Sequence, residues 1–256
     1  MRGFAGRYVF VAGLHRTGTS LVASLIAQHP EVAAIVQSPA PENEGCYLQG
    51  AIPHTAMHGI PGHYAADRRQ HHVEGSRHDT LAVQQRIAAD WDSWFEPGGQ
   101  WRIEKSPVNL TRMRLYQQLF PMAQFVIVLR HPEAMAAALA KWTDQPAAEL
   151  IEYALAAYEL ALEDARYLHA VLFVRYEDLA ADMAQLMAKA DMFLSLDEHQ
   201  RSTTVHNRNK EYLGCQAMNE KQSERALAFG YLPGLDIQKS TLHSHHPLRS
   251  IRDQLQ

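Results

Sequence analysis

The sequence has little of several features that would point to other classes of protein. It contains only two cysteines, Cys46 and Cys215, which lack metal-ligand spacing and are expected to be free thiols. No apolar run approaches the roughly 18 residues that a membrane-spanning helix needs. The net charge is −4 and the basic residues form no stripe, so nucleic acid is not an expected partner.

Linkers and repeats are also absent from the sequence. No Pro/Gly/Ser-rich stretch divides the 256 residues, and 46% of them are apolar, enough for one sizeable core. We therefore expect a single domain over residues 1–256.

The fifteen histidines suggest a metal site, but their spacing does not support one. The clustered ones are His54, His58, His63, His71, His72 and His78. Gly59 and the Pro61-Gly62 pair interrupt the first group, so no helix can present its histidines on one face. No recognised zinc spacing is present, and no metal is predicted.

The most informative segment is residues 8–20, YVFVAGLHRTGTS. Residues 8–14 form an apolar run typical of a buried parallel strand, and after Ser20 apolar residues recur at helical spacing up to His29-Pro30. The connecting loop has the outline of the nucleotide-binding G-x-x-x-x-G-K-S/T motif, but Thr19 stands where the lysine for the outer phosphates belongs. The segment therefore predicts a phosphate-binding loop whose ligand is not an ordinary triphosphate.

Physical chemistry favours an anion at this strand-to-helix junction. The first N–H groups of a helix lack carbonyl partners and lie at the positive end of its dipole. Gly18 permits a close approach of the backbone, and Arg16 can bind phosphate or sulfate oxygens with two hydrogen bonds. The hydroxyls of Thr17, Thr19 and Ser20 add donors.

A second anion site is predicted after residues 125–129, FVIVL, the clearest other buried strand. A triphosphate enzyme would need an acidic residue here to hold Mg²⁺. The strand is instead followed by Arg130-His131-Pro132, and Pro132 is suited to start a helix. Two separate anion sites indicate a nucleotide that carries phosphate at two positions.

The periodicity elsewhere indicates an α/β fold. Residues 32–36 and 170–174 resemble further strands, while residues 108–119, 134–142 and 147–168 have helical spacing. This alternation predicts three α/β/α layers around a mainly parallel sheet, similar to the P-loop nucleoside-triphosphate hydrolases. Ligands of such sheets bind at the carboxyl ends of the strands, where Arg16, Lys105 and Arg130 fall.

Together these segments resemble the sulfotransferases that use 3′-phosphoadenosine 5′-phosphosulfate (PAPS). The resemblance covers about residues 8–180 and four motifs: GLHRTGTS at 13–20, EKSPVNL at 104–110, LFPMAQFVIVLRHP at 119–132 and, more weakly, VRYEDL at 174–179. It is closest to bacterial members and shares features with the tyrosylprotein and heparan glucosaminyl branches. It implies a cytoplasmic enzyme that transfers a sulfuryl group to a hydroxyl or amine of a small-molecule, glycan or peptide acceptor without a metal.

The resemblance also implies roles for individual residues. The 5′-phosphosulfate would be held by the loop residues His15, Arg16, Thr17, Gly18, Thr19 and Ser20. Arg130 would bind the 3′-phosphate, and Lys105 would neutralise the leaving phosphate. The family usually has a serine eight residues after the arginine, and this chain has Ala138, so one hydroxyl contact is missing. Loss of such a contact costs roughly ten- to a hundred-fold in affinity.

The acceptor hydroxyl needs a base, and three residues are candidates. Glu42 and Glu44 lie in a loop after residues 32–36, and His15 lies in the phosphate loop. A similar Glu-Asn-Glu segment in the heparan glucosaminyl branch, where the second glutamate is the base, favours Glu44.

Two further segments have expected roles in binding. Residues 48–92 are assigned to an acceptor-binding lid, with walls supplied by Tyr47, Tyr64, Trp91 and Trp94. Residues 200–235 contain NRNKEY at 207–212, which resembles a family segment that closes over the nucleotide. Arg208 of this motif is a predicted nucleotide contact. Arg201 and Lys210, also within residues 200–235, are further candidates.

Two other functions compete with sulfuryl transfer. A P-loop kinase-like phosphotransferase would use ATP and Mg²⁺, but Thr19 and Arg130 replace the residues it needs. A non-catalytic nucleotide-binding protein is favoured by Ala138 and opposed by the joint presence of Arg16, Lys105 and Glu44.

Overall fold

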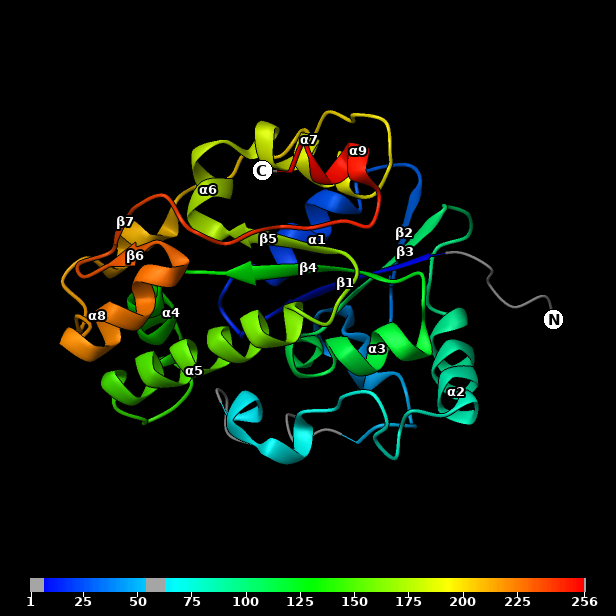
Figure 1. Ribbon diagram of the computed structural model, residues 1–256, viewed down its shortest axis with the longest axis horizontal. Coiled ribbons are helices and arrows are strands. Elements are labelled where there is room, and N and C mark those ends of the chain that lie inside the picture. Colours follow the sequence, from blue (N-terminus) through cyan, green and yellow to red (C-terminus); the bar gives the residue numbers. More distant parts are fainter. Residues whose placement is uncertain (1–6, 54–62, 256) are drawn as a thin grey trace.

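The protein is built around a five-stranded parallel sheet, shown in the computed structural model, which describes residues 7–53 and 63–255 (Figure 1). The strands are β1 Arg7–Gly13, β2 Val32–Ala34, β3 Trp101–Lys105, β4 Gln124–Leu129 and β5 Val171–Arg175, in the order β2-β3-β1-β4-β5. Every neighbouring pair is parallel. The predicted α/β fold is confirmed.

Helices connect these strands and follow the last one. They are α1 Thr19–Ile26, α2 Leu81–Asp92, α3 Met113–Leu119, α4 Pro132–Leu139, α5 Ala147–Ala165, α6 Tyr176–Ala181, α7 Met183–Phe193, α8 Glu220–Ala226 and α9 Arg249–Arg252. A short hairpin, β6 Tyr231–Leu232 and β7 Asp236–Ile237, lies beside α8 (Figure 1).

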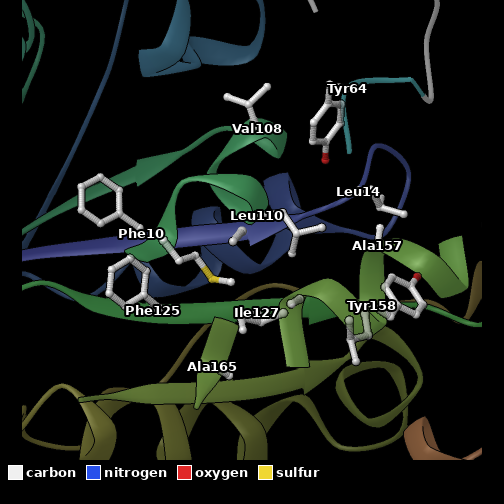
Figure 2. Close-up of a cluster of buried hydrophobic side chains, with 14 of the residues drawn as sticks. Phe10, Leu14, Tyr64, Val108, Leu110, Phe125, Ile127, Ala157, Tyr158 and Ala165 are labelled. Carbon is white, nitrogen blue, oxygen red and sulfur yellow. The ribbon is translucent and has the colours of Figure 1, made fainter. Parts of the chain in front are cut away.

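The two faces of the sheet carry separate apolar cores because successive strand residues point to opposite sides. In β1, Val9 and Val11 pack with α1, α7 and α9, whereas Phe10 and its neighbours pack with α2, α3 and α5. These two groups of helices lie on opposite sides of the sheet (Figure 1). Figure 2 shows the second core, in which Phe10 and Phe125 lie side by side from β1 and β4. The sheet is thus covered on both faces, as the three-layer prediction requires.

One predicted helix is wrong in detail. Residues 108–119 were expected to form a single helix, but they are divided between a 3-10 turn at Pro107–Thr111 and α3. Arg112 separates the two with φ −127° and ψ 1°, which is not helical. The apolar spacing runs through this break because the side chains on both sides of it, including Val108 and Leu115, enter the same core.

The carboxyl ends of the three central strands meet at one edge of the sheet. In the register of the sheet, Val11 of β1 pairs with Lys105 of β3, and Gly13 pairs with Val128 of β4. The loop before α1, the end of β3 and the residue after β4 therefore lie together. No helix within the described ranges is long and apolar enough to cross a bilayer.

Candidate functional site

The loop between β1 and α1 has the tight backbone that an anion cradle requires. Gly18 has φ 99°, and a Cβ added there would lie 3.1 Å from the ring of Tyr176. Arg16 also has a positive φ, 67°, and its guanidinium lies over the ring of Trp142 at 4.9 Å. Gly18 immediately precedes α1 and has no side chain to cap it, so the first N–H groups of the helix face the loop.

The hydroxyls predicted in this loop have different surroundings. Thr19 and Ser20 line the pocket beside the loop. Thr17 is fully buried, and its hydroxyl donates to the carbonyl of Leu14 at 2.7 Å. The structure therefore gives the Thr17 hydroxyl a part in holding the loop together.

Lys105 and both predicted carboxylates form one ionic cluster. Nζ of Lys105 lies 2.9 Å from Oε1 of Glu44 and 3.2 Å from Oε2 of Glu42. The side chains of Lys105 and Glu44 are about nine-tenths buried, whereas 62% of the Glu42 side chain is exposed. Glu42 also accepts a hydrogen bond from Ser20 at 2.5 Å, which links the cluster to the β1–α1 loop.

The environment separates the three candidate bases by their acidity. Burial raises the pKa of Glu44 to about 6, against the opposing attraction of Lys105. The hydrogen bond from Ser20 lowers the pKa of Glu42, and Lys105 adds to this effect. Burial and, to a smaller extent, the positive charge of Lys105 lower the pKa of His15 to about 4. Glu44 therefore has the pKa best matched to proton abstraction near neutral pH.

Arg130 follows β4 and is almost buried. Its Nε donates to Oδ1 of Asn209 and its Nη1 to the carbonyl of Arg16, both at 2.8 Å. The guanidinium also lies over the ring of Tyr176 at 4.7 Å. Its Nη2 is buried and has no hydrogen-bond partner among the described residues, so one donor remains for a ligand.

A chain of hydrogen bonds joins Arg130 to the segment after α7. Asn209 accepts from Arg130 and donates to Oε1 of Glu177, and the same Glu177 oxygen accepts from the backbone N–H of His131. Because Glu177 is buried at the start of α6, this chain fixes the 3-10 turn Arg208–Tyr212 against the end of β4.

The two predicted anion sites open into one pocket of about 420 Å³. Its lining includes His15, Arg16, Gly18, Thr19, Ser20, Glu42, Glu44, Arg130 and Arg208 from the sequence prediction. Lys105 contacts this lining through Glu42 and Glu44. Pocket residues that the sequence prediction missed are Leu21, Pro107, Trp142, Tyr176, Thr204, Val205 and His206. Pro107 and Tyr176 lie in the motifs at 104–110 and 174–179, and Thr204, Val205 and His206 lie in the predicted closing segment 200–235, but none of them was named as a contact.

Some predicted contacts lie elsewhere. The Arg201 side chain is buried and forms an ion pair with Asp191, so Arg201 is not free to bind a phosphate in this structure. Lys210 is exposed and does not line the pocket. Ala138 is fully buried in α4 and is not among the pocket-lining residues either.

The aromatic walls predicted for an acceptor lid are partly wrong. Trp91 is fully buried in the core and donates from Nε1 to the carbonyl of Gly45 at 2.8 Å. Tyr64 is also in this core, where its hydroxyl contacts the carbonyls of Gly13 and Pro107 (Figure 2). These side chains are held by core packing, which aromatic composition alone could not distinguish from a binding wall.

The histidine cluster gives no metal site in the part of the chain that the structure covers. Within residues 7–53 and 63–255, no three His, Cys, Asp or Glu side chains are grouped to hold an ion. His54 and His58 lie outside these ranges.

Comparison with known proteins gives a family and a fold. The model of the sulfotransferase family matches residues 8–200. The structure is similar to a sulfotransferase from Mycobacterium avium, with 15% identity, a TM-score of 0.53 and coverage of 88% of this chain and 76% of that one. It also matches the sulfotransferase domain of the Synechococcus PCC 7002 olefin synthase, with 18% identity and a TM-score of 0.49. This match covers 88% of this chain and 95% of that domain. No curated protein matches this chain.

Proposed function

The chain belongs to the sulfotransferase family, and on this premise we propose that it transfers a sulfuryl group from PAPS to a hydroxyl or amine of an acceptor. The observation that carries the proposal is the joining of two cationic sites in one pocket. Arg130 donates to the carbonyl of Arg16, so the arginine after β4 and the loop after β1 form one continuous anion surface. A nucleotide with both a 5′ and a 3′ anionic group suits this surface.

The residues present fit such a nucleotide. The unpartnered Nη2 of Arg130 is a buried donor beside Tyr176, as a 3′-phosphate site needs. The turn at Gly18 and the helix start at Thr19 fit a 5′-phosphosulfate. Thr204, His206 and Arg208 line the same pocket and are the available substitutes for the missing hydroxyl at position 138. Bound PAPS supplies the sulfuryl group.

The mechanism follows from the roles of three side chains. Glu44 takes the proton of the acceptor hydroxyl, because its raised pKa of about 6 makes it a stronger base than an ordinary carboxylate. Lys105 neutralises the charge that grows on the leaving phosphate oxygen, and Arg16 holds the anionic oxygens in line. Trp142, which stacks on Arg16, forms part of the wall on the acceptor side.

The segments around the pocket complete the proposal. We assign residues 200–235 to the closure of the nucleotide site, because Thr204, His206 and Arg208 line the pocket and Asn209 bonds to Arg130. We assign contact with the acceptor to Pro107 and Trp142, which line the pocket. Trp91 is not included, because its side chain is buried in the core.

The proposal is tested by transfer of label from ³⁵S-labelled PAPS to a panel of alcohols, phenols, amines and sugars in the presence of EDTA. We expect labelled product without Mg²⁺, because the strand end that would hold the metal carries Arg130. Phosphate transfer from ATP that requires Mg²⁺, with no sulfuryl transfer, would instead identify a phosphotransferase.

A further inference from the structure

Glu104 is a buried carboxylate between the two halves of the proposed catalytic cluster. It precedes Lys105 in β3, and its Oε1 accepts a hydrogen bond from the backbone N–H of Gly45, the residue after Glu44, at 2.9 Å. The same oxygen accepts from the hydroxyl of Ser106 at 2.5 Å. Its Oε2 accepts from Nδ2 of Asn109 at 2.6 Å. One side chain therefore ties the segment of the base to the segment of the lysine.

Two of the three hydrogen-bond partners of Glu104, Asn109 and the backbone of Gly45, are fixed as donors and stabilise its ionised form. Nδ2 of Asn109 also donates to the carbonyl of Val11, which can only accept, so the orientation of the amide is fixed. The backbone N–H of Gly45 can only donate. Burial raises the pKa of Glu104, but hydrogen bonds from Ser106, Asn109 and Gly45 oppose this effect and favour the charged form.

The loop that carries Glu44 is held at successive backbone groups. The Gly45 carbonyl accepts from Trp91, and the N–H of Cys46 donates to Oγ of Ser106 at 3.1 Å. A Cβ at Gly45 would lie 2.8 Å from Cγ and Oε1 of Glu104, so a larger residue would force the two segments apart. The loop is thus tightly fitted to the end of β3 directly beside Glu44.

We propose that Glu104 is a positioning residue for sulfuryl transfer: through Gly45 and Ser106, its carboxylate holds Glu44 and Lys105 at hydrogen-bonding distance from each other. This inference rests on the proposed function for the roles of Glu44 and Lys105. Glu104 does not line the pocket and needs no contact with substrate. We call the hydrogen bonds that join Glu104 to Gly45 and Ser106 the clamp. Displacing a catalytic group by about 1 Å can cost on the order of 100-fold in rate, so loss of the clamp should have a large effect on turnover.

The charge of Glu104 also affects Glu44. Its negative charge contributes to the raised pKa of Glu44, after the larger effect of burial. The other charged groups that influence Glu44 are Lys105 and Glu42, and His15 lines the same pocket. Loss of the Glu104 charge and loosening of the buried loop both favour ionised Glu44, so both lower its pKa.

The main test is the titration of Glu44 in the Glu104→Gln variant, followed by ¹³C NMR of the labelled glutamate carboxyl groups and assigned with Glu44→Gln. The glutamine amide carries no charge. Its NH₂ group also takes the place of a carboxylate oxygen that accepts a hydrogen bond, so one of the present donors to Glu104 loses its acceptor. We expect the Glu44 midpoint to fall by about half a pH unit or more. Turnover should fall about 10- to 100-fold, with its acidic limb moved to lower pH, while affinity for 3′-phosphoadenosine 5′-phosphate (PAP) changes less than threefold.

Two further variants separate the clamp from general damage to the fold. Ser106→Ala keeps the Glu104 charge and removes one link, so it should lower turnover with a smaller change in the Glu44 midpoint. Glu177→Gln removes a buried carboxylate that binds Asn209, the partner of Arg130, and should weaken PAP binding without moving that midpoint. An unchanged midpoint and turnover in folded Glu104→Gln would overturn the inference, as would an equal shift of the midpoint in Glu177→Gln.

The titration also separates this inference from the proposed function. If the wild-type protein transfers no sulfuryl group but the Glu44 midpoint falls in both Glu104→Gln and the charge-preserving Ser106→Ala, the clamp is supported and the reaction assignment is wrong; a fall in Glu104→Gln alone would be explained by the lost charge and would contradict the clamp. If sulfuryl transfer occurs and the midpoint does not move, the reaction assignment is supported and the clamp is wrong.

Discussion

Nζ of Lys105 lies 2.9 Å from Oε1 of Glu44, although 61 positions separate the two residues in the chain. The contact is almost buried, so the attraction is screened by solvent less than it would be on an open surface. Burial nevertheless outweighs the attraction of Lys105 and leaves Glu44 with a raised pKa. The pair thus combines a base of intermediate strength with a cation beside it, which is the arrangement on which the proposed mechanism depends.

Replacing Lys105 by alanine should reduce turnover by about 100-fold, because charge on the leaving phosphate grows in the transition state. PAP affinity should fall much less. Steady-state kinetics and calorimetry on the same preparation measure both quantities, with Lys239→Ala as the control at an exposed lysine outside the pocket and outside residues 200–235. Equal losses in turnover and affinity would assign Lys105 to ground-state binding.

The two loop glutamates should respond in opposite ways to substitution by glutamine. Glu44→Gln removes the base and should lower turnover by about 100-fold or more, with PAP affinity nearly unchanged. In the free protein the Glu42 carboxylate binds Ser20 and Lys105, so it competes with the nucleotide phosphates for these two groups. Glu42→Gln removes this negative charge, and PAP should therefore bind about fivefold more tightly. Turnover lost in Glu42→Gln and retained in Glu44→Gln would move the base to Glu42.

Activity should fall on the acidic side of about pH 6. Glu44 must be ionised to accept a proton, so kcat/KM should fall about tenfold for each pH unit below its pKa and reach a plateau above it. Neither of the other two candidate bases should cause a change in kcat/KM near pH 6. The pKa of Glu42 is lowered, and His15 stays neutral down to about pH 4. Bound PAPS is anionic and should raise the pKa of Glu44. The acidic fall of kcat, which reports the complex with bound substrates, should therefore lie at higher pH than the acidic fall of kcat/KM. A pH-independent kcat/KM between 5 and 7 would contradict this role of Glu44.

Arg130 should discriminate between nucleotides by the 3′-phosphate. Arg130→Ala should weaken PAP binding by about 10- to 100-fold, the cost of a lost charge-assisted hydrogen bond, and leave AMP binding almost unchanged. Arg68→Ala provides an exposed control away from the pocket. An equal effect on PAP and AMP would mean that Arg130 acts only by holding the loop at Arg16.

The parts of the site that could be predicted are those with a local signal. The loop before α1 and Arg130 each follow a continuous apolar strand, and parallel strands bring their carboxyl ends to one edge. Glu44 and Lys105 were chosen from short motifs, and the structure brings them together. In these cases the chemistry and its position are encoded within a few residues.

The parts that could not be predicted depend on long-range packing. Residues 200–235 were predicted to close over the nucleotide, but Thr204 and His206 lie in a stretch with no periodicity and could not be singled out within it. The hydroxyl of Tyr176 donates to the carbonyl of His206, a contact between residues 30 positions apart. Trp91 has the composition of a ligand wall, but its indole N–H is used by the carbonyl of Gly45 inside the core. The clamp at Glu104 also depends on a long-range contact, because its partner Gly45 is 59 residues away. No pattern in the sequence predicts that these two residues meet.

The measurement that tests the account most directly is calorimetric titration of the wild-type protein with PAP, AMP and ATP with Mg²⁺, each at several salt concentrations. We predict that PAP binds with micromolar or tighter affinity without a metal, and that AMP and ATP with Mg²⁺ bind much more weakly. Preference for ATP with Mg²⁺, or equal binding of PAP and AMP, would contradict a pocket built for a nucleotide with anionic groups at both its 3′ and 5′ positions.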